Sequence, residues 1–190
     1  MIKSVKDLSF IFDERSNFKD LKSTNLLYRM SEHGAKFSDF HSRCDDKGPT
    51  LVLMKCSNGR VCGGYTSVSW STGGSRQAIS ESSFMTIIMQ KGGGFRKDEK
   101  AFLFSVDLKT CYLPTNPDEA VFHGANEGPN FGQPELALFR EPMDGQYKGV
   151  CHAGKKKYYD VPKDDDGNSP LTGQGKDRAN LFTCAECEVY

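Results

Sequence analysis

The sequence predicts a mostly β domain of the α+β class, and three features lead to that prediction. The 190 residues include 13 Phe and 7 Tyr, and 37% are hydrophobic, which is enough to fill one core. A hairpin is encoded around Asn58-Gly59, and short apolar runs recur along the chain. Short apolar runs that are bounded by charges or turn residues indicate strands.

The hairpin is the strongest local signal. Residues 50–56 (TLVLMKC) form a run with two largely apolar faces, as in a strand covered on both sides. Ser57-Asn58-Gly59 follows, and an Asn-Gly pair supplies the positive φ angles of a two-residue turn. We therefore expect residues 61–70 to return antiparallel to residues 50–56.

Further strands are expected where other apolar runs occur, and the last run should be paired inside the sheet. These runs are residues 26–28, 101–106, 120–123, 136–139 and 181–190. One short helix is expected over residues 36–44. It places Phe37, Phe40, His41 and Cys44 at i, i+3, i+4 and i+7, so all four should face the core.

The chain is interpreted as one domain over residues 21–190 with an N-terminal extension at residues 1–20. Two segments, 71–100 and 152–179, are expected to be insertions or long loops. The first contains glycine pairs and one candidate strand at residues 84–89, and the second mixes lysines and aspartates with Gly, Pro and Asn. The second composition predicts that this loop buries little surface.

Composition excludes several classes of protein. Twenty-five basic residues balance 25 acidic ones, so no net positive field favours nucleic acid. Seven cysteines without paired spacing are unlike a secreted disulfide framework. The sequence also shows neither a signal-peptide h-region nor an apolar run of about 18 residues. We therefore expect an intracellular, cytoplasmic protein without membrane insertion.

Several motifs suggest chemistry but fit it poorly, so no metal or cofactor is predicted. Cys184 and Cys187 have CxxC spacing, yet residues three apart on a straight strand point to opposite faces. Asp164-Asp165-Asp166-Gly167 lacks the carboxylate that a calcium loop needs at its first position, where Pro162 stands. The triple glycine at residues 92–94 lacks the other residues of a phosphate-binding loop. The basic and aromatic run at residues 155–159 is interpreted mainly as solvated charge.

A thiol enzyme is an alternative that the sequence leaves open. His41 and Cys44 share a helix face, and Asp45 is adjacent, so a Cys-His-Asp arrangement for peroxide chemistry is possible. The same face carries Phe37 and Phe40, and a cysteine on an apolar face is typically a small core residue. The core interpretation is preferred.

Two longer segments resemble the TLDc domain family. These are residues 40–51 (FHSRCDDKGPTL) and 63–70 (GGYTSVSW). Further similarity follows in the family's order at residues 26–28, 101–105, 128–132, Phe182 and 188–190. The resemblance implies two packed antiparallel sheets, a β-sandwich, with a few short helices. Two departures from the family pattern are the long 71–100 segment and Gln133-Pro134-Glu135 after the GPNFG run.

The resemblance also implies a function. TLDc proteins are linked to oxidative-stress resistance and to binding of the vacuolar proton-pumping ATPase, and no catalytic residues are established for them. Gly34, Gly63 and Gly132 match glycines of the family pattern and are expected to border the partner-binding surface. A small accessory subunit of a ciliary, microtubule or mitochondrial assembly, or a protein on an organelle surface, is the alternative.

Overall fold

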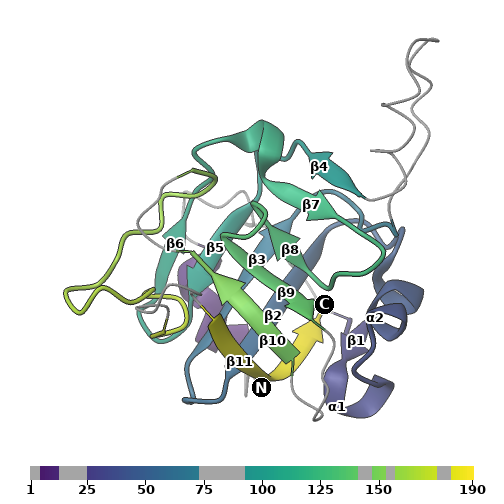
Figure 1. The fold of residues 1–190 in the computed structure, drawn as a ribbon, viewed down its shortest axis with the longest axis horizontal. Helices are drawn as coiled ribbons and strands as arrows, with labels where there is room; N and C mark the ends of the chain where they lie inside the picture. The colour runs from purple at the N-terminus through teal and green to yellow at the C-terminus, as the bar shows by residue number, and fades with distance from the viewer. Residues whose placement is uncertain (1–4, 13–24, 73–92, 141–146, 153–156, 175–180) are drawn as a thin grey trace.

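The computed structural model describes residues 5–12, 25–72, 93–140, 147–152, 157–174 and 181–190 (Figure 1). The helical elements are η1 (Val5–Phe12), α1 (Met30–His33), α2 (Phe37–Cys44) and η2 (Pro117–Glu119). The strands are β1 (Tyr28–Arg29), β2 (Thr50–Cys56), β3 (Val61–Thr66), β4 (Gly94–Arg96), β5 (Phe102–Ser105), β6 (Thr110–Tyr112), β7 (Val121–His123), β8 (Asn130–Phe131), β9 (Leu136–Arg140), β10 (Tyr147–Cys151) and β11 (Leu181–Val189).

All the strands belong to one antiparallel path. Its order is β4-β7-β8-β9-β10-β11-β2-β3-β5-β6, and β1 pairs with β11. The path folds over itself, because the ring of Phe131 in β8 lies directly against Gly64 in β3. The ring of Trp70 also meets Phe131 edge to face, with 5.7 Å between centroids. The predicted two-layer, mostly β fold is therefore confirmed.

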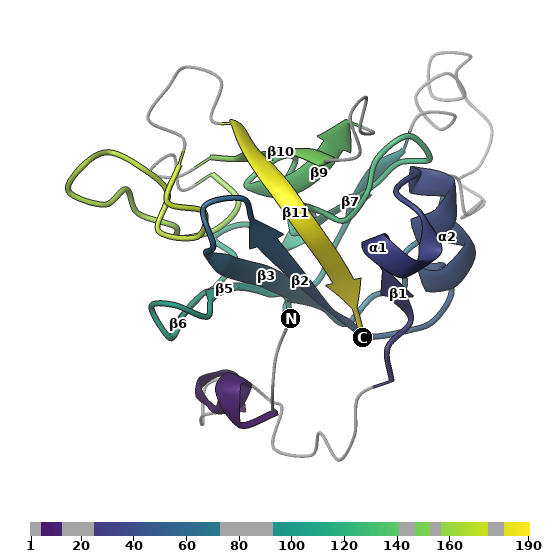
Figure 2. The same cartoon turned by 90° about the horizontal axis from the view of Figure 1, so that it is seen from below.

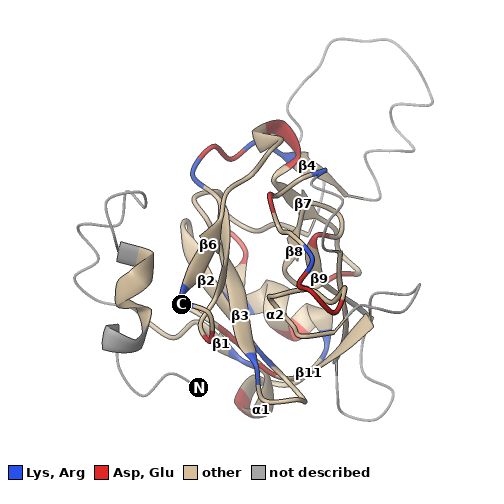
Figure 3. Cartoon of the chain, turned by 90° about the vertical axis from the view of Figure 1, so that its left-hand side faces the viewer, with Lys and Arg blue, Asp and Glu red and all other residues tan. Residues whose placement is uncertain are grey.

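Two layers of apolar packing follow from this arrangement. The main core fills the space between the β2, β3, β5 layer and the β7, β8, β9 layer. A second apolar cluster lies on the outer side of the β2, β3, β5 layer, where η1 covers it. Figure 3 shows η1 on one side of β2 and β3 and the strands β7, β8 and β9 on the other. Figure 2 shows the same order from below.

The hairpin prediction is confirmed, with a shorter second strand. Residues 50–56 form β2 and pair antiparallel with β3. β3 ends at Thr66, because the buried carboxylate of Asp98 accepts bonds from the backbone N–H and hydroxyl of Ser67 at 2.6 and 2.7 Å. These bonds bend the chain away from the sheet, so residues 67–70 do not continue the strand.

The other predicted elements are largely recovered. The helix is α2, and its four apolar-face residues are all buried. β1, β5, β7, β9 and β11 lie within or overlap the predicted runs, and β11 is paired with β2, β10 and β1. β4, β6, β8 and β10 were not predicted. The first three have only two or three residues each, and β10 has no continuous apolar run. The candidate strand at residues 84–89 lies outside the described residues.

The prediction that residues 152–179 bury little surface is wrong for several side chains. Three of them, Tyr159, Val161 and Leu171, are fully buried in the main core. The Tyr159 hydroxyl donates to the carbonyl of Ala120 at 2.8 Å. The polar composition of the segment concealed these three residues, because they are spaced widely among charges. Asp164 instead stays in a local turn and accepts from the backbone N–H of Asn168 at 2.7 Å.

Candidate partner-binding surface

The His41 imidazole is held in a closed polar cluster that joins α2 to the β7–β8 loop. Its Nδ1 lies 2.8 Å from a carboxylate oxygen of Asp45. Its Nε2 lies 3.1 and 3.0 Å from the carbonyl oxygens of Gly124 and Glu127. All three partners lie inside the protein, so both ring nitrogens are engaged there. No position on this ring is left for a substrate or a thiol.

Cys44 does not have the setting of a reactive thiol. Its side chain is fully buried in the main core. Burial, with a smaller contribution from the Asp45 carboxylate, raises the pKa of the Cys44 thiol to about 12. A peroxide-reducing cysteine needs an accessible thiolate, which this position does not supply. The structure thus places His41 beside Asp45, but it does not give His41 an accessible and reactive Cys44 thiol.

Cys184 and Cys187 face the same side of β11, which corrects the expectation of opposite faces. The pairing of β11 with β2 shifts register between Cys184 and Glu186, as at a β-bulge. The extra residue rotates the following side chains, so both cysteines enter the main core. Burial raises the pKa of both thiols. Within the described ranges, no three His, Cys, Asp or Glu side chains are placed to hold a metal ion.

The three glycines expected at a partner surface lie in different environments. Gly34 is exposed at the end of α1 with φ of 100°, and the Tyr28 hydroxyl donates to its carbonyl at 2.8 Å. Gly63 is buried in β3, where a Cβ atom would lie 1.9 Å from the Val52 carbonyl oxygen. Gly132 is buried with φ of 67°, against Tyr158. Close packing therefore explains Gly63 and Gly132, and their role at a partner surface stays a prediction.

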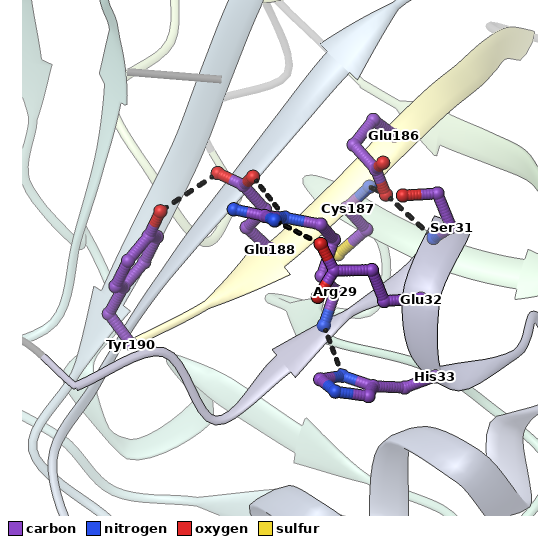
Figure 4. Close-up of polar contacts among 8 residues, drawn as sticks. All are labelled: Arg29, Ser31, Glu32, His33, Glu186, Cys187, Glu188 and Tyr190. Carbon is purple, nitrogen blue, oxygen red and sulfur yellow. Dashed lines mark hydrogen bonds and ion pairs between the residues drawn. The ribbon is translucent and has the colours of Figure 1, made fainter. Parts of the chain in front are cut away.

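A second polar cluster lies where β1 and α1 meet the end of β11 (Figure 4). The Arg29 guanidinium is at its centre. Its Nε donates to Glu188 at 2.8 Å, and one of its terminal nitrogens donates to Glu32. The Tyr190 hydroxyl donates to the other oxygen of Glu188 at 3.0 Å. These contacts tie the first strand, the first helix and the last strand to one another.

Glu186 and His33 complete this cluster through the backbone. One carboxylate oxygen of Glu186 accepts from the N–H groups of Ser31 and Cys187, at 3.2 and 3.0 Å. The N–H of Arg29 donates to Nδ1 of His33 at 2.9 Å. We call the set Arg29, Glu32, Glu186 and Glu188 the acidic rim, because it contains three carboxylates and one guanidinium.

The acidic rim is fixed on its inner side and open on its outer side. The Glu188 side chain is 1% exposed, whereas those of Arg29 and Glu32 are 30% and 52% exposed. Hydrogen bonds to Glu32 and Glu188 raise the pKa of Arg29, so the guanidinium stays charged. A preorganised set of charges that reaches solvent is suited to contact a protein partner.

Sequence comparison finds a family match over part of the chain. The family model of the TLDc domain matches residues 2–91, a range that includes α1, α2 and the β2–β3 hairpin. Over this range the chain is similar to the TLDc family. The matched range contains Arg29 and Glu32 of the acidic rim, whereas Glu186 and Glu188 lie beyond it. The rim is thus completed by residues outside the matched range.

Several proteins are similar to this chain over short segments. TBC1 domain family member 24 of Xenopus tropicalis is 39% identical over 70 residues, which is 37% of this chain and 12% of that protein. MTOR-associated protein MEAK7 of Danio rerio is 28% identical over 81 residues, 43% of this chain and 14% of that protein. GTPase-activating protein skywalker of Drosophila melanogaster is 40% identical over 45 residues, which is 24% of this chain and 8% of that protein. The matched segments are a small part of each relative.

Sequence reasoning missed the acidic rim, although one signal was present. Glu186 and Glu188 alternate with Cys187 in the last strand, which places two carboxylates on one face of a chain end otherwise rich in buried residues. A period of two in a strand predicts a shared face. Arg29 follows the first strand directly, but nothing in the sequence indicates that β1 pairs with β11.

Proposed function

We propose that this TLDc domain is a protein-binding module without catalytic activity, and that the acidic rim is part of its partner-binding surface. The observation that carries the proposal is the fixed and exposed Arg29–Glu32 pair, anchored beneath by the buried Glu188. Preorganised charges of this kind determine which partner binds and in which orientation. Gly34 lies at the end of the same helix and is the one predicted glycine that is exposed.

Absence of a catalytic role is supported by the other candidate cluster. His41 has all its polar contacts inside the protein, and the Cys44 thiol is buried with a raised pKa. A thiol enzyme would need a histidine with a ring nitrogen free for the thiol and an accessible cysteine with a lowered pKa.

The proposed partner is a peripheral subunit of the vacuolar proton-pumping ATPase, with a contribution to oxidative-stress resistance. Similarity to the TLDc family supports this choice, because other family members are linked to that pump. The relative from Danio rerio is named MTOR-associated, so a similar chain occurs in a protein that associates with another. Within the described residues, no helix is long and apolar enough to cross a bilayer. Contact is proposed with the soluble parts of the pump.

An affinity capture with matched variants tests this proposal. The tagged chain is compared with two variants, Glu32→Lys and Glu99→Lys. Glu99→Lys makes the same charge change at an exposed glutamate that follows β4 in the chain. Figure 1 shows β4 far from α1, the helix that carries Glu32. We expect pump subunits on the unmodified chain and on Glu99→Lys, and their loss on Glu32→Lys. Equal retention by both variants would exclude the rim from the interface. Capture of axonemal or respiratory components instead would support the accessory-subunit alternative.

A further inference from the structure

The outer face of the β2, β3, β5 layer is apolar. Leu51 and Leu53 of β2 and Phe102 and Phe104 of β5 point away from the main core and form their own buried cluster. The ring of Tyr65 stacks on Phe102 with centroids 5.3 Å apart. In a two-layer fold the outer face of a sheet is normally polar, because only the inner face needs an apolar partner. This face therefore requires a cover.

The cover is the short helix η1. Leu8 and Ile11 are buried against the outer face, and the ring of Phe10 meets that of Phe104 edge to face at 6.4 Å. These contacts are all apolar or aromatic. In Figures 2 and 3 the helix lies apart from the two sheet layers, as a separate third layer.

A helix of this kind depends on the surface beneath it. η1 is an eight-residue 3-10 helix, and 3-10 runs longer than about four residues are uncommon because their hydrogen bonds are poorly aligned. Helices this short are also marginal in water by themselves. The outer face therefore holds η1 in helical form, which shows that the face accepts a helix with apolar residues three positions apart.

The acidic rim borders this face along β11. Glu188 lies opposite Leu53 in the register of β11 with β2, and Glu186 lies opposite Lys55. Side chains directly opposite on paired strands share a face. Tyr190 connects the two regions, because its ring packs on the apolar cluster and its hydroxyl donates to Glu188. The apolar face thus has one border that carries three carboxylates, Glu32, Glu186 and Glu188, and two basic groups, Arg29 and Lys55.

We propose that this outer face is a helix-docking site, which η1 occupies in the free protein and a partner's helix takes in its place. The site fits an amphipathic helix with an apolar stripe and with lysine or arginine along one edge, since that edge would lie against the acidic rim. The inference goes beyond the proposed function, because it concerns a second, apolar surface. It holds whether or not the pump is the partner.

The test uses the full chain with η1 displaced. Leu8→Glu combined with Ile11→Glu removes the two buried anchors of η1 and leaves the main core untouched. Leu113→Glu, at an apolar residue that is 54% exposed, is the control. The probe is a labelled synthetic helical peptide of about 15 residues with leucines three and four apart and lysines along one edge. A second peptide carries glutamates in place of the lysines.

Fluorescence anisotropy gives the decisive comparison. The η1-displaced variant should bind the lysine peptide about tenfold or more tightly than the unmodified chain, because η1 reduces the fraction of binding-competent molecules. The control should bind like the unmodified chain, and the glutamate peptide should bind more weakly. Equal binding by the variant and the unmodified chain, or a preference for the glutamate peptide, would overturn the proposal.

A second measurement needs no variant. Hydrogen exchange of the unmodified chain is followed with the lysine peptide in excess. Displacement of η1 predicts faster exchange at residues 5–12 together with slower exchange in β2 and β5. Unchanged exchange at residues 5–12 in the presence of bound peptide would show that the peptide binds elsewhere, which also contradicts the proposal.

Discussion

The two polar clusters of this domain are built from the same kinds of contact but differ in exposure. Around His41, a short helix is joined to a distant loop by one carboxylate and two carbonyl groups, and the imidazole is 6% exposed. Around Arg29, a short helix is joined to the last strand by two carboxylates, and Glu32 is 52% exposed. The first cluster uses all its polar groups internally, whereas the second presents charges to solvent.

This difference separates a structural role from a binding role. A buried ring with three internal acceptors holds elements together, and it cannot give up a contact without leaving buried groups unpaired. An exposed ion pair contributes little to stability, so its charges can be used for recognition at low cost. Substitutions in the two clusters should therefore affect different properties.

The largest effect on stability is expected in the closed cluster. His41→Ala leaves Asp45 and the carbonyls of Gly124 and Glu127 without their partner, and should lower the free energy of unfolding by about 2–4 kcal/mol. Urea denaturation followed by Trp70 fluorescence measures this loss. His33→Ala, in the cluster around Arg29, is the control and should lower the free energy of unfolding by clearly less. A similar loss for both variants would contradict the distinction between the clusters.

A pH effect of nearly the same size is expected at His123, next to the closed cluster. Burial, with Arg96 and His41 nearby, lowers the pKa of His123 from 6.5 to about 4. The unfolded chain therefore binds more protons between these values, so stability is complete above pH 6.5 and falls as the pH drops towards 4. The loss should reach about 3 kcal/mol.

The matched variant is His123→Gln, which does not titrate. Its urea midpoint should fall less between pH 6.5 and 4 than that of the unmodified chain. Parallel curves for the two proteins would show that His123 is protonated as easily in the folded as in the unfolded state.

A smaller effect is expected within the open cluster, where one carboxylate is buried and one is exposed. Glu188→Gln weakens bonds to Arg29 and Tyr190 at a buried position and should cost about 1–2 kcal/mol. Glu32→Gln changes only the exposed partner of Arg29 and should leave the unfolding midpoint unchanged. Thermal and urea unfolding of both variants test this order, and a larger loss for Glu32→Gln would reverse it.

The sequence predicts the closed cluster better than the open one, for a physical reason. His41 and Cys44 lie in one helix and Asp45 follows it directly, so local sequence alone places the three close together. Arg29 and Glu188 are brought together only by the pairing of β1 with β11. Long-range pairing leaves no local pattern, and the bulge before Glu186 alters the faces of the last strand in a way that regular alternation does not predict.

The same reasoning explains how the fold was predicted. The β2–β3 hairpin follows from an Asn-Gly turn between two apolar runs, so the local sequence defines it. The shorter strands β6 and β8 depend on neighbours already in place. The buried Tyr159 and Leu171 occur in a segment with loop composition, because single apolar residues can reach a core between charged ones.

Hydrogen–deuterium exchange of the free and partner-bound chain tests the central claim most directly. The account predicts slower exchange on binding at residues 28–34 and 186–190, which carry the acidic rim, and no change at residues 40–45 and 121–131 around His41. Protection confined to the region around His41, with residues 28–34 and 186–190 unchanged, would contradict the assignment of the partner-binding surface.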